Sequence, residues 1–271
     1  MPLGANSWGK SEVRVSKIHH GAETDDFSDV TVQVRLEGEV AAAHTDGDNR
    51  GVLPTDTMRN TVYGLAQEHL TKDLEGFASR LCERFLTSPG VTKATVNLWE
   101  ASWARETATG FVGGGSERRV ATVARGSEDS TVAGIEGLVL LKTTGSSFSG
   151  FPRDEFTVLA DAEDRLLATS VTAFWLYSLL PTDTAATWSK VRRALIDDFF
   201  ANSSASVQHQ GYMMGEAVLA AVPEIEEITL YLPNQHHLPF DVSRFGVEWA
   251  GNVFHPVSQP YGDIRLTVTR D

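Results

Sequence analysis

The sequence predicts an α+β protein in which antiparallel sheets carry helices on one face and the order ββααββ occurs twice. Extended segments with alternating apolar residues are spread over the chain, and two pairs of helical segments interrupt them. The first two extended segments are joined by a connection too short for a crossover helix. Strands joined in this way pair antiparallel, so the helices are expected on one face of each sheet.

The first half of the chain provides one complete set of these elements. The elements predicted there are strands at 11–21 and 29–40, helices from Thr55 to about Leu70 and from Asp73 to Pro89-Gly90, and strands at 92–103 and 117–125. The clearest strand alternates apolar and polar residues from Val30 to Leu36, which is typical of a strand with one buried face. The glycine-rich segment 113–116 is interpreted as a hairpin connection.

The second half repeats the order of elements without a convincing repeat of residues. The elements predicted there are strands at 135–143 and within 155–177, helices around 188–199 and 207–222, and strands at 225–232 and 263–270. The helix at 188–199 shows an apolar stripe, and the last strand alternates apolar residues from Ile264 to Val268. We therefore expect two units of ordinary domain size, residues 1–129 and 130–271.

Composition and charge narrow the class of protein. The chain has 271 residues, of which 41% are hydrophobic, so it can bury a large core. Its formal net charge of −13 repels the phosphate backbone of nucleic acids and acidic membranes, and neither is an expected partner. Charge does not exclude a small anionic substrate, because a local pocket can oppose the overall field.

Cysteine content and the termini indicate the compartment. Cys82 is the only cysteine and lies in an apolar helical pattern, which favours a buried thiol and excludes a disulfide framework. Residues 1–10 lack the apolar run of a signal peptide, and no stretch is long and apolar enough for a membrane span. A soluble protein of the reducing cytoplasm is expected.

Motifs for common cofactors are missing from the sequence. The glycines at 110–115 lack the spacing of a dinucleotide-binding fingerprint, and the chain has no phosphate-binding loop or nucleophile elbow. The adjacent pairs His19-His20 and His236-His237 are not supported by a metal-binding motif. An enzyme with this sequence is expected to work without a nucleotide cofactor or a metal.

Signals for a helix start are concentrated at residues 54–57. Pro54 cannot continue a strand ladder, and Thr55, Asp56 and Thr57 are all residue types that favour a helix N-cap. A helix that begins here directs free backbone N–H groups and a positive dipole end towards whatever lies beside Thr55. The segment is either an ordinary capped helix or a place that holds an anion next to a hydroxyl group.

Five stretches, in a fixed order and spread over nearly the whole chain, carry the most specific signal. They are Trp8-Gly9-Lys10, residues 54–63, residues 147–157 followed by 164–169, Ser206-Val207-Gln208, and residues 232–237 with Pro260-Tyr261-Gly262. Together they resemble the urate oxidase (uricase) family. Trp8 and Gln235 depart from the Tyr and Lys common in the family, at positions to which no chemistry is assigned. The lack of a C-terminal Ser-Lys-Leu signal points to a bacterial-type member.

This resemblance implies a particular fold and assembly. Family members have the tunnelling fold (T-fold), with two tandem ββααββ units per chain. Their antiparallel sheets close into barrels on oligomerisation, and two barrels stack in a homotetramer. Barrel closure removes the exposed sheet edges that a single chain would present. Active sites in the family lie between subunits.

The resemblance also assigns a role to nine residues. The implied catalytic residues are Lys10, Thr55 and His236, and the implied substrate-binding residues are Thr55, Asp56, Phe148, Arg165, Val207, Gln208 and Asn234. Urate is a flat, anionic purine, so a phenylalanine ring can stack on it and an arginine fork can bind paired acceptors on its edge. A glutamine can pair with its amide-like edge.

The reaction implied is oxidation of urate by O2 without a cofactor, which yields 5-hydroxyisourate and hydrogen peroxide. Because O2 is a triplet, urate must first be ionised further and then give up electrons singly. Lys10 and Thr55 are implied as a base and a hydroxyl relay, with His236 extending it. Asn234 is implied to hold oxygen or water.

The residue types alone leave other roles open. Phe148 can be a core residue, Arg165 can form a surface salt bridge with Asp161 or Asp164, and Gln208 and His236 can be solvent-facing or loop residues. At the level of function, two alternatives also remain. One is a metal-dependent enzyme of the same fold that acts on a purine or pterin, and the other is a non-catalytic oligomeric urate-binding module.

Overall fold

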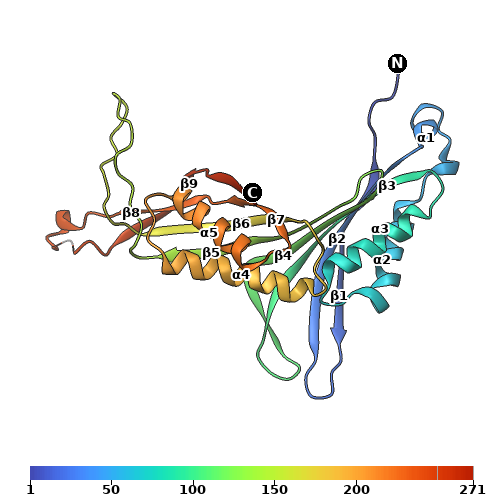
Figure 1. Cartoon of the computed structure of the whole chain (residues 1–271), viewed down its shortest axis with the longest axis horizontal. Helices are drawn as coiled ribbons and strands as arrows, with labels where there is room; N and C mark the ends of the chain where they lie inside the picture. Colours follow the sequence, from blue (N-terminus) through green and yellow to red (C-terminus); the bar gives the residue numbers. More distant parts are fainter. Residues whose placement is uncertain (249, 271) are drawn as a thin grey trace. The chain divides into compact units, whose positions relative to one another are not determined.

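The structure is a computed structural model that describes residues 1–248 and 250–270. It divides into two compact units (Figure 1). The first contains residues 1–135 and 175–188, and the second contains 136–174 and the rest of the chain from residue 189. The predicted division at residues 129 and 130 stays a prediction. Each unit is described here by itself.

The first unit is built on four antiparallel strands in the order β1-β2-β3-β4. Its elements are β1 (Trp8–His19), β2 (Asp26–Gly38), α1 (Ala41–Thr45), the 3-10 turn η1 (Asn49–Gly51), α2 (Thr55–His69), α3 (Leu74–Leu86), β3 (Val91–Arg105) and β4 (Phe111–Gly126). Helices α2 and α3 lie along this sheet (Figure 1) and share one hydrophobic core with it. The order ββααββ is thereby confirmed for the first half, with α1 and η1 as short additions.

Helix α2 is held on the sheet by a narrow apolar stripe. Its buried residues, Met58, Val62 and Ala66, are four residues apart and so lie on one face of the helix. Helix α3 buries a wider stripe that includes Phe77, which is only 1% exposed. Both stripes pack on the side chains that β2 directs to the same face, and this fixes where the first turn of α2 lies.

Strand β1 is bonded to both ends of α2. The indole Nε1–H of Trp8 donates to the backbone carbonyl of Leu53, just before the helix, at 3.0 Å. At the other end, the Lys17 ammonium donates to three carbonyls of the last turn, those of Ala66, Gln67 and Leu70, at 2.8–3.1 Å. A cation at this position offsets the negative end of the helix dipole.

Replacing Lys17 by Met is therefore expected to lower the thermal midpoint. The methionine keeps most of the apolar stem but removes the ammonium from three helix-end carbonyls, of which only that of Ala66 keeps a backbone donor among the described residues, a loss of about 1–2 kcal/mol. For a protein of this size the midpoint should fall by about 2–4 °C, measured by calorimetry. Lys93→Met is the matched control, because Lys93 pairs with the exposed Glu128 and such pairs contribute little. Equal shifts in both variants would contradict the capping role.

The second unit repeats the architecture with an inserted hairpin. Its elements are β5 (Ser130–Lys142), β6 (Leu167–Tyr177), α4 (Thr184–Ala201), α5 (Val207–Ala221), β7 (Ile225–Tyr231), β8 (Asn234–Pro239), the turn η2 (Ser243–Phe245), β9 (Phe254–Gly262) and β10 (Arg265–Thr269). The strand order is β5-β6-β7-β10, and the β8–β9 hairpin leaves this path because β8 pairs with β6. Strands β5 and β6 and helix α4 each begin or end in the first unit.

Two predictions about local structure were wrong. The glycine-rich segment 113–116 lies inside β4, where Gly113 pairs with Trp103, and the hairpin connection is the preceding turn, closed by Glu106 N–H donating to the Gly110 carbonyl. Most of 155–166 is irregular, and the strand begins only at Leu167. Apolar residues suggested strand there, but the segment forms only an isolated bridge, between Ala162 and Phe148.

Candidate active site

The second unit contains a pocket of about 640 Å³, a size typical of small-ligand sites. Six of the residues assigned from the sequence line it. They are Phe148, Arg165, Val207, Gln208, Asn234 and His236. The loop before β6, the start of α5 and the start of β8 supply these residues, so segments distant in sequence form one wall.

Phe148 is held by backbone pairing on both sides. It exchanges two backbone hydrogen bonds with Ala162, at 2.8 and 2.9 Å, and the neighbouring Ser147 N–H donates to Ser204. Its ring stacks on Phe151 with 4.9 Å between centroids and 13° between planes. Phe148 is therefore half-buried in the pocket wall with one neighbour fixing its ring, which suits a stacking platform better than a core residue.

Arg165 lines the pocket, and one of its donors is buried without a partner among the described residues. Its backbone N–H donates to Ser146 at 2.7 Å, and its guanidinium carbon lies 5.3 Å from the centre of the Phe148 ring. The Nε–H is buried and has no hydrogen-bond partner among the described residues. Burial lowers the pKa of Arg165, but a guanidinium remains protonated in proteins. The side chain is thus a cation with a free hydrogen-bonding edge.

The alternative salt bridges of Arg165 do not form. Asp161 pairs instead with Arg153, at 3.2 Å. Asp164 accepts hydrogen bonds from the Thr144 hydroxyl and from the Gly145 N–H, the latter at 2.7 Å. This carboxylate joins the segment that carries Arg165 to the segment that leads to Phe148.

The same contacts make this part of the pocket sensitive to acid. The Thr144 and Gly145 hydrogen bonds hold the pKa of Asp164 below its usual value of 3.8. A carboxyl whose folded pKa is lowered contributes stability above its unfolded pKa, and that contribution is lost as the pH falls through the folded pKa. We expect Asp164→Asn to lower the thermal midpoint at pH 7, and the difference from the parent to shrink below about pH 4.

Calorimetric scans between pH 3 and pH 7 measure this effect. Glu163→Gln is the control, because the neighbouring Glu163 is exposed and forms none of these loop contacts. A difference between Asp164→Asn and the parent that stays constant from pH 7 to pH 3 would contradict the carboxylate's role.

Helix α5 places Val207 and Gln208 at its first two positions. Ser206 caps the helix, and its hydroxyl accepts the His209 N–H at 3.0 Å. Val207 is buried, whereas Gln208 is exposed at the pocket rim with its amide free to reach a ligand. The first N–H groups of a helix also favour an anionic or electron-rich neighbour.

A buried polar network beneath this helix start was not predicted. The Lys142 ammonium donates to Gln210 Oε1 at 2.7 Å and to the Asn202 carbonyl at 2.8 Å, and Gln210 Nε2 donates to Asp198 at 3.1 Å. The network ties the end of β5 to the first turn of α5, which carries Val207. Its residues are scattered in the sequence, and only the fold brings them together.

Asn234 and His236 are positioned by the β8–β9 hairpin. Asn234 pairs with Thr169 of β6 on one side and with Gly262 of β9 on the other. The Asn234 amide nitrogen lies 3.5 Å from His236 Nδ1, at the long end for a hydrogen bond. Asn234 is consequently fixed by two strands, while His236 lies two residues along the same strand.

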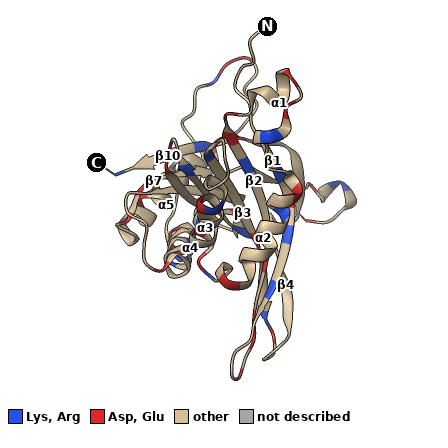
Figure 2. Cartoon of the chain, turned by 90° about the vertical axis from the view of Figure 1, so that its right-hand side faces the viewer, with Lys and Arg blue, Asp and Glu red and all other residues tan. Residues whose placement is uncertain are grey.

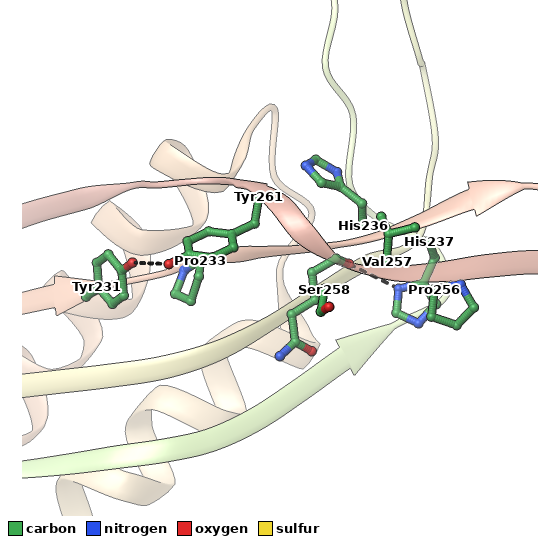
Figure 3. Close-up of a pocket in the computed structure, with 9 residues that line it drawn as sticks. Tyr231, Pro233, His236, His237, Pro256, Val257, Ser258 and Tyr261 are labelled. Carbon is green, nitrogen blue, oxygen red and sulfur yellow. Dashed lines mark hydrogen bonds between the residues drawn. The ribbon is translucent and has the colours of Figure 1, made fainter.

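A second hollow, of about 570 Å³, adjoins the same hairpin. Figure 3 shows that His236 and His237 of β8 lie beside Pro256 and Val257 of β9, with the hydrogen-bonded pair Tyr231 and Tyr261 further along. His236 lines both hollows.

The remaining assigned residues lie in the first unit. Lys10 is on β1, half-buried and opposite Val34 of β2, and Thr55 is the first residue of α2. The N-cap residue is Pro54, which has no side-chain acceptor, so the first N–H groups of α2 stay available. The Asp56 carboxylate forms an ion pair with Arg59, one turn further along the helix, at 2.8 Å. The backbone N–H of Asp56 is therefore the group available to a ligand.

Apolar pocket residues were missed by the sequence analysis. Leu159, Leu166, Phe254 and Ile264 all line the pocket. The predicted last strand, 263–270, includes Ile264 among its alternating apolar residues, but β10 begins at Arg265 and the Ile264 carbonyl accepts the Leu232 N–H. Apolar residues in loops have no periodic signal that could have assigned them to a site.

Charged side chains of both signs are spread over the chain. Figure 2 shows Lys and Arg alternating with Asp and Glu along the ribbon. In residues 1–248 and 250–270, no three His, Cys, Asp or Glu side chains are grouped so that they could hold a metal ion. None of the helices described is both long and apolar enough to pass through a membrane.

An antiparallel sheet with paired helices, and a pocket that offers an aromatic ring, a guanidinium and an amide, define a protein that binds a small, flat, polar anion. Residues 6–133 and 131–265 match the model of the Uricase family. The uricase of Arthrobacter globiformis is 40% identical over 99% of this chain and 90% of its own length, and the uricase of Dictyostelium discoideum is 36% identical over 98% and 96%.

Solved structures agree with this match. The crystal structure of the Arthrobacter globiformis uricase has a TM-score of 0.95 at 40% identity, and the alignment covers 100% of this chain and 96% of that one. The chain belongs to the uricase family. The predicted family and the predicted T-fold are both confirmed.

Proposed function

We infer that the chain catalyses the reaction for which its family is named, the oxidation of urate by O2 and water to 5-hydroxyisourate and hydrogen peroxide. The observation that carries this inference is a pocket that brings the Arg165 guanidinium together with the Phe148 ring and the Gln208 amide, in a chain of the uricase family. These three groups suit a flat anion, because an aromatic ring stacks on its face and a guanidinium and an amide bind the acceptors on its edge.

The substrate-binding role follows from the shape and charge of urate. The ring stacks on Phe148, and the Arg165 fork donates to two acceptors on one edge. Gln208 pairs with the amide-like edge, and the backbone of Val207 adds a further contact. Each of these groups would recognise a planar oxypurine anion better than a neutral or non-planar compound.

Proton transfer is the task of the residues in the first unit. Lys10 acts as the base and the Thr55 hydroxyl relays the proton, beside the open N-terminus of α2, where the Asp56 N–H meets the imidazole side of the ring. We propose that these three residues reach the pocket of another copy of the chain within a homotetramer. The proposal is supported by family membership and by the unpartnered first turn of α2.

The oxidation itself needs no group beyond the substrate and O2. Removal of a second proton makes urate electron-rich enough to pass two electrons singly to O2, which adds to the ring as a hydroperoxide. The hydroperoxide eliminates hydrogen peroxide, and addition of water to the same carbon then gives 5-hydroxyisourate. Asn234 holds O2 or water above the ring, and His236 extends the proton path. We propose that neither a metal nor a nucleotide cofactor takes part.

An aerobic urate assay tests this function. Purified protein is treated with a chelator, mixed with urate in air, and followed by loss of the urate absorbance together with formation of peroxide. We expect equal turnover before and after chelation. Unchanged urate in air would overturn the proposal, and activity that returns only with added metal would instead indicate a metal-dependent enzyme. Tight urate binding without peroxide would indicate a binding module.

A further inference from the structure

Along strand β1, the alternation of side chains between the two faces of the sheet is interrupted between Lys10 and Val13. Lys10 pairs with Val34 and Val13 pairs with Val32, so Ser11 and Glu12 together oppose the single residue Gln33. This arrangement is a β-bulge, in which one extra residue is inserted on one strand. Because side chains alternate between the two faces of a sheet, the extra residue reverses which of them point towards the helices.

The burial of β1 confirms this reversal. Beyond the bulge, odd-numbered residues face the helices: Val13 and Val15 are buried, and Lys17 reaches the end of α2. Before the bulge, even-numbered residues take that face, since Trp8 packs against the core and bonds to Leu53. Lys10 is two residues from Trp8 and lies opposite the buried Val34, so it shares the face of α2.

Without the bulge, Lys10 would face the other way. If the regular ladder through Val13 and Val32 continued, Lys10 would pair with Arg35, whose side chain is exposed between the buried Val34 and Leu36. Lys10 and Thr55 are now each two residues from the Trp8–Leu53 hydrogen bond. In the regular ladder the lysine would be on the opposite face from Thr55.

Glu12 is the residue that makes the bulge possible. It has a φ of 57°, and in residues 1–248 and 250–270 it is the single non-glycine residue with positive φ. This left-handed conformation is tolerated by Gly and Asn, is unfavourable for most other residues and is worst for β-branched ones. The Glu12 side chain is exposed, so its contribution is backbone geometry.

We propose that Glu12 is a positioning residue, whose left-handed backbone forms the bulge that turns Lys10 towards Thr55. This inference rests on the proposed proton-transfer role of Lys10. It identifies the conformation of residue 12, rather than its charge, as a determinant of turnover. Residues 1–7 form no regular element, so the free arm before β1 can slip by one residue when the bulge is lost.

Four variants at residue 12 test the proposal. The kcat of each is compared with that of Lys10→Met, in which the proposed base itself is removed. Glu12→Gln removes the charge and Glu12→Gly favours the left-handed backbone, and both should keep kcat within about twofold of the parent. Glu12→Ile disfavours the bulge and should lower kcat at least tenfold, with KM for urate nearly unchanged because the pocket residues are intact. Deleting Glu12 leaves Lys10 opposite Val34 in a regular ladder, so the deletion should retain more kcat than Glu12→Ile.

The outcomes separate this inference from the proposed function. Full kcat in Glu12→Ile, with kcat lost in Lys10→Met, would overturn the bulge proposal alone, whereas full kcat in Lys10→Met would overturn the role of Lys10. Should Glu12→Ile fail to fold, the deletion decides: a loss as large as that of Lys10→Met contradicts the proposal.

A rescue experiment gives a second readout. In the slipped ladder Ser11 would oppose Val34, so moving the lysine to that position, in Glu12→Ile combined with Lys10→Ser and Ser11→Lys, should recover part of kcat. A triple variant with no more activity than Glu12→Ile would also overturn the proposal, provided that a crystal structure of Glu12→Ile shows the slipped ladder, and so would full activity of a Glu12→Ile variant in which position 10 no longer pairs with Val34.

Discussion

Replacing Lys10 by Met, or Thr55 by Ala, is expected to lower kcat for urate by roughly 10²–10⁴-fold, the usual contribution of a positioned acid or base. Urate binding should change little, because the pocket that contains Phe148 and Arg165 is untouched. A group that acts only in proton transfer affects kcat and kcat/KM equally. Steady-state kinetics in air, combined with urate binding measured without oxygen, separates the two quantities.

Matched controls are available close to both residues. Thr57→Ala removes a hydroxyl from the same first turn of α2, and Lys93→Met removes a lysine from another strand of the same unit. Both should leave turnover close to that of the parent. Losses of equal size in kcat and in urate affinity for Lys10→Met would contradict a relay and would indicate a binding role.

Replacing Arg165 by Gln is expected to weaken urate binding by roughly 10²–10⁴-fold. Two charge-assisted hydrogen bonds are lost, each contributing about 1.5–3 kcal/mol, and every 1.4 kcal/mol is a factor of ten in affinity. Arg165→Lys should lose nearly as much, because an ammonium keeps the charge but not the planar fork. The dissociation constant for urate measured without oxygen reports the effect free of turnover.

Arg153→Gln is the control for this experiment. Arg153 also lies near an aromatic ring, with its guanidinium carbon 4.8 Å from the centre of Phe151, but it pairs with Asp161 and does not line the pocket. Its replacement should leave urate affinity within about twofold. An Arg165→Gln variant that binds as tightly as Arg153→Gln would falsify the assignment of Arg165 to the substrate.

Hydrophobic periodicity was enough to predict the framework of both units. The alternation from Val30 to Leu36 and the helical stripes correspond to side chains that are buried in the structure. Strands β8 and β9 were not predicted, because their sequences are polar and show no clean alternation of apolar and polar residues. They form through pairing with each other and with β6, and such partners are not visible in the local sequence.

The site was predictable as a set of residues but not as a geometry. The resemblance supplied the six pocket residues, whereas the Lys142 network and the apolar wall around Ile264 arise only from the tertiary fold. The predicted first strand began at residue 11 and left out Lys10. The three-residue spacing from Lys10 to Val13 looks irregular in sequence, and only the bulge explains how both residues share a face.

The stacked rings of Phe148 and Phe151 have an energetic consequence for ligand capture. Phe151 already packs against the Phe148 ring without a ligand, with 4.9 Å between the ring centroids. The rotational freedom of Phe148 was given up when the chain folded, and an arriving planar molecule need not restrain it again. Phe151 thus favours ligand binding without touching the ligand. It does so by reducing the conformational entropy that the Phe148 ring still has to lose.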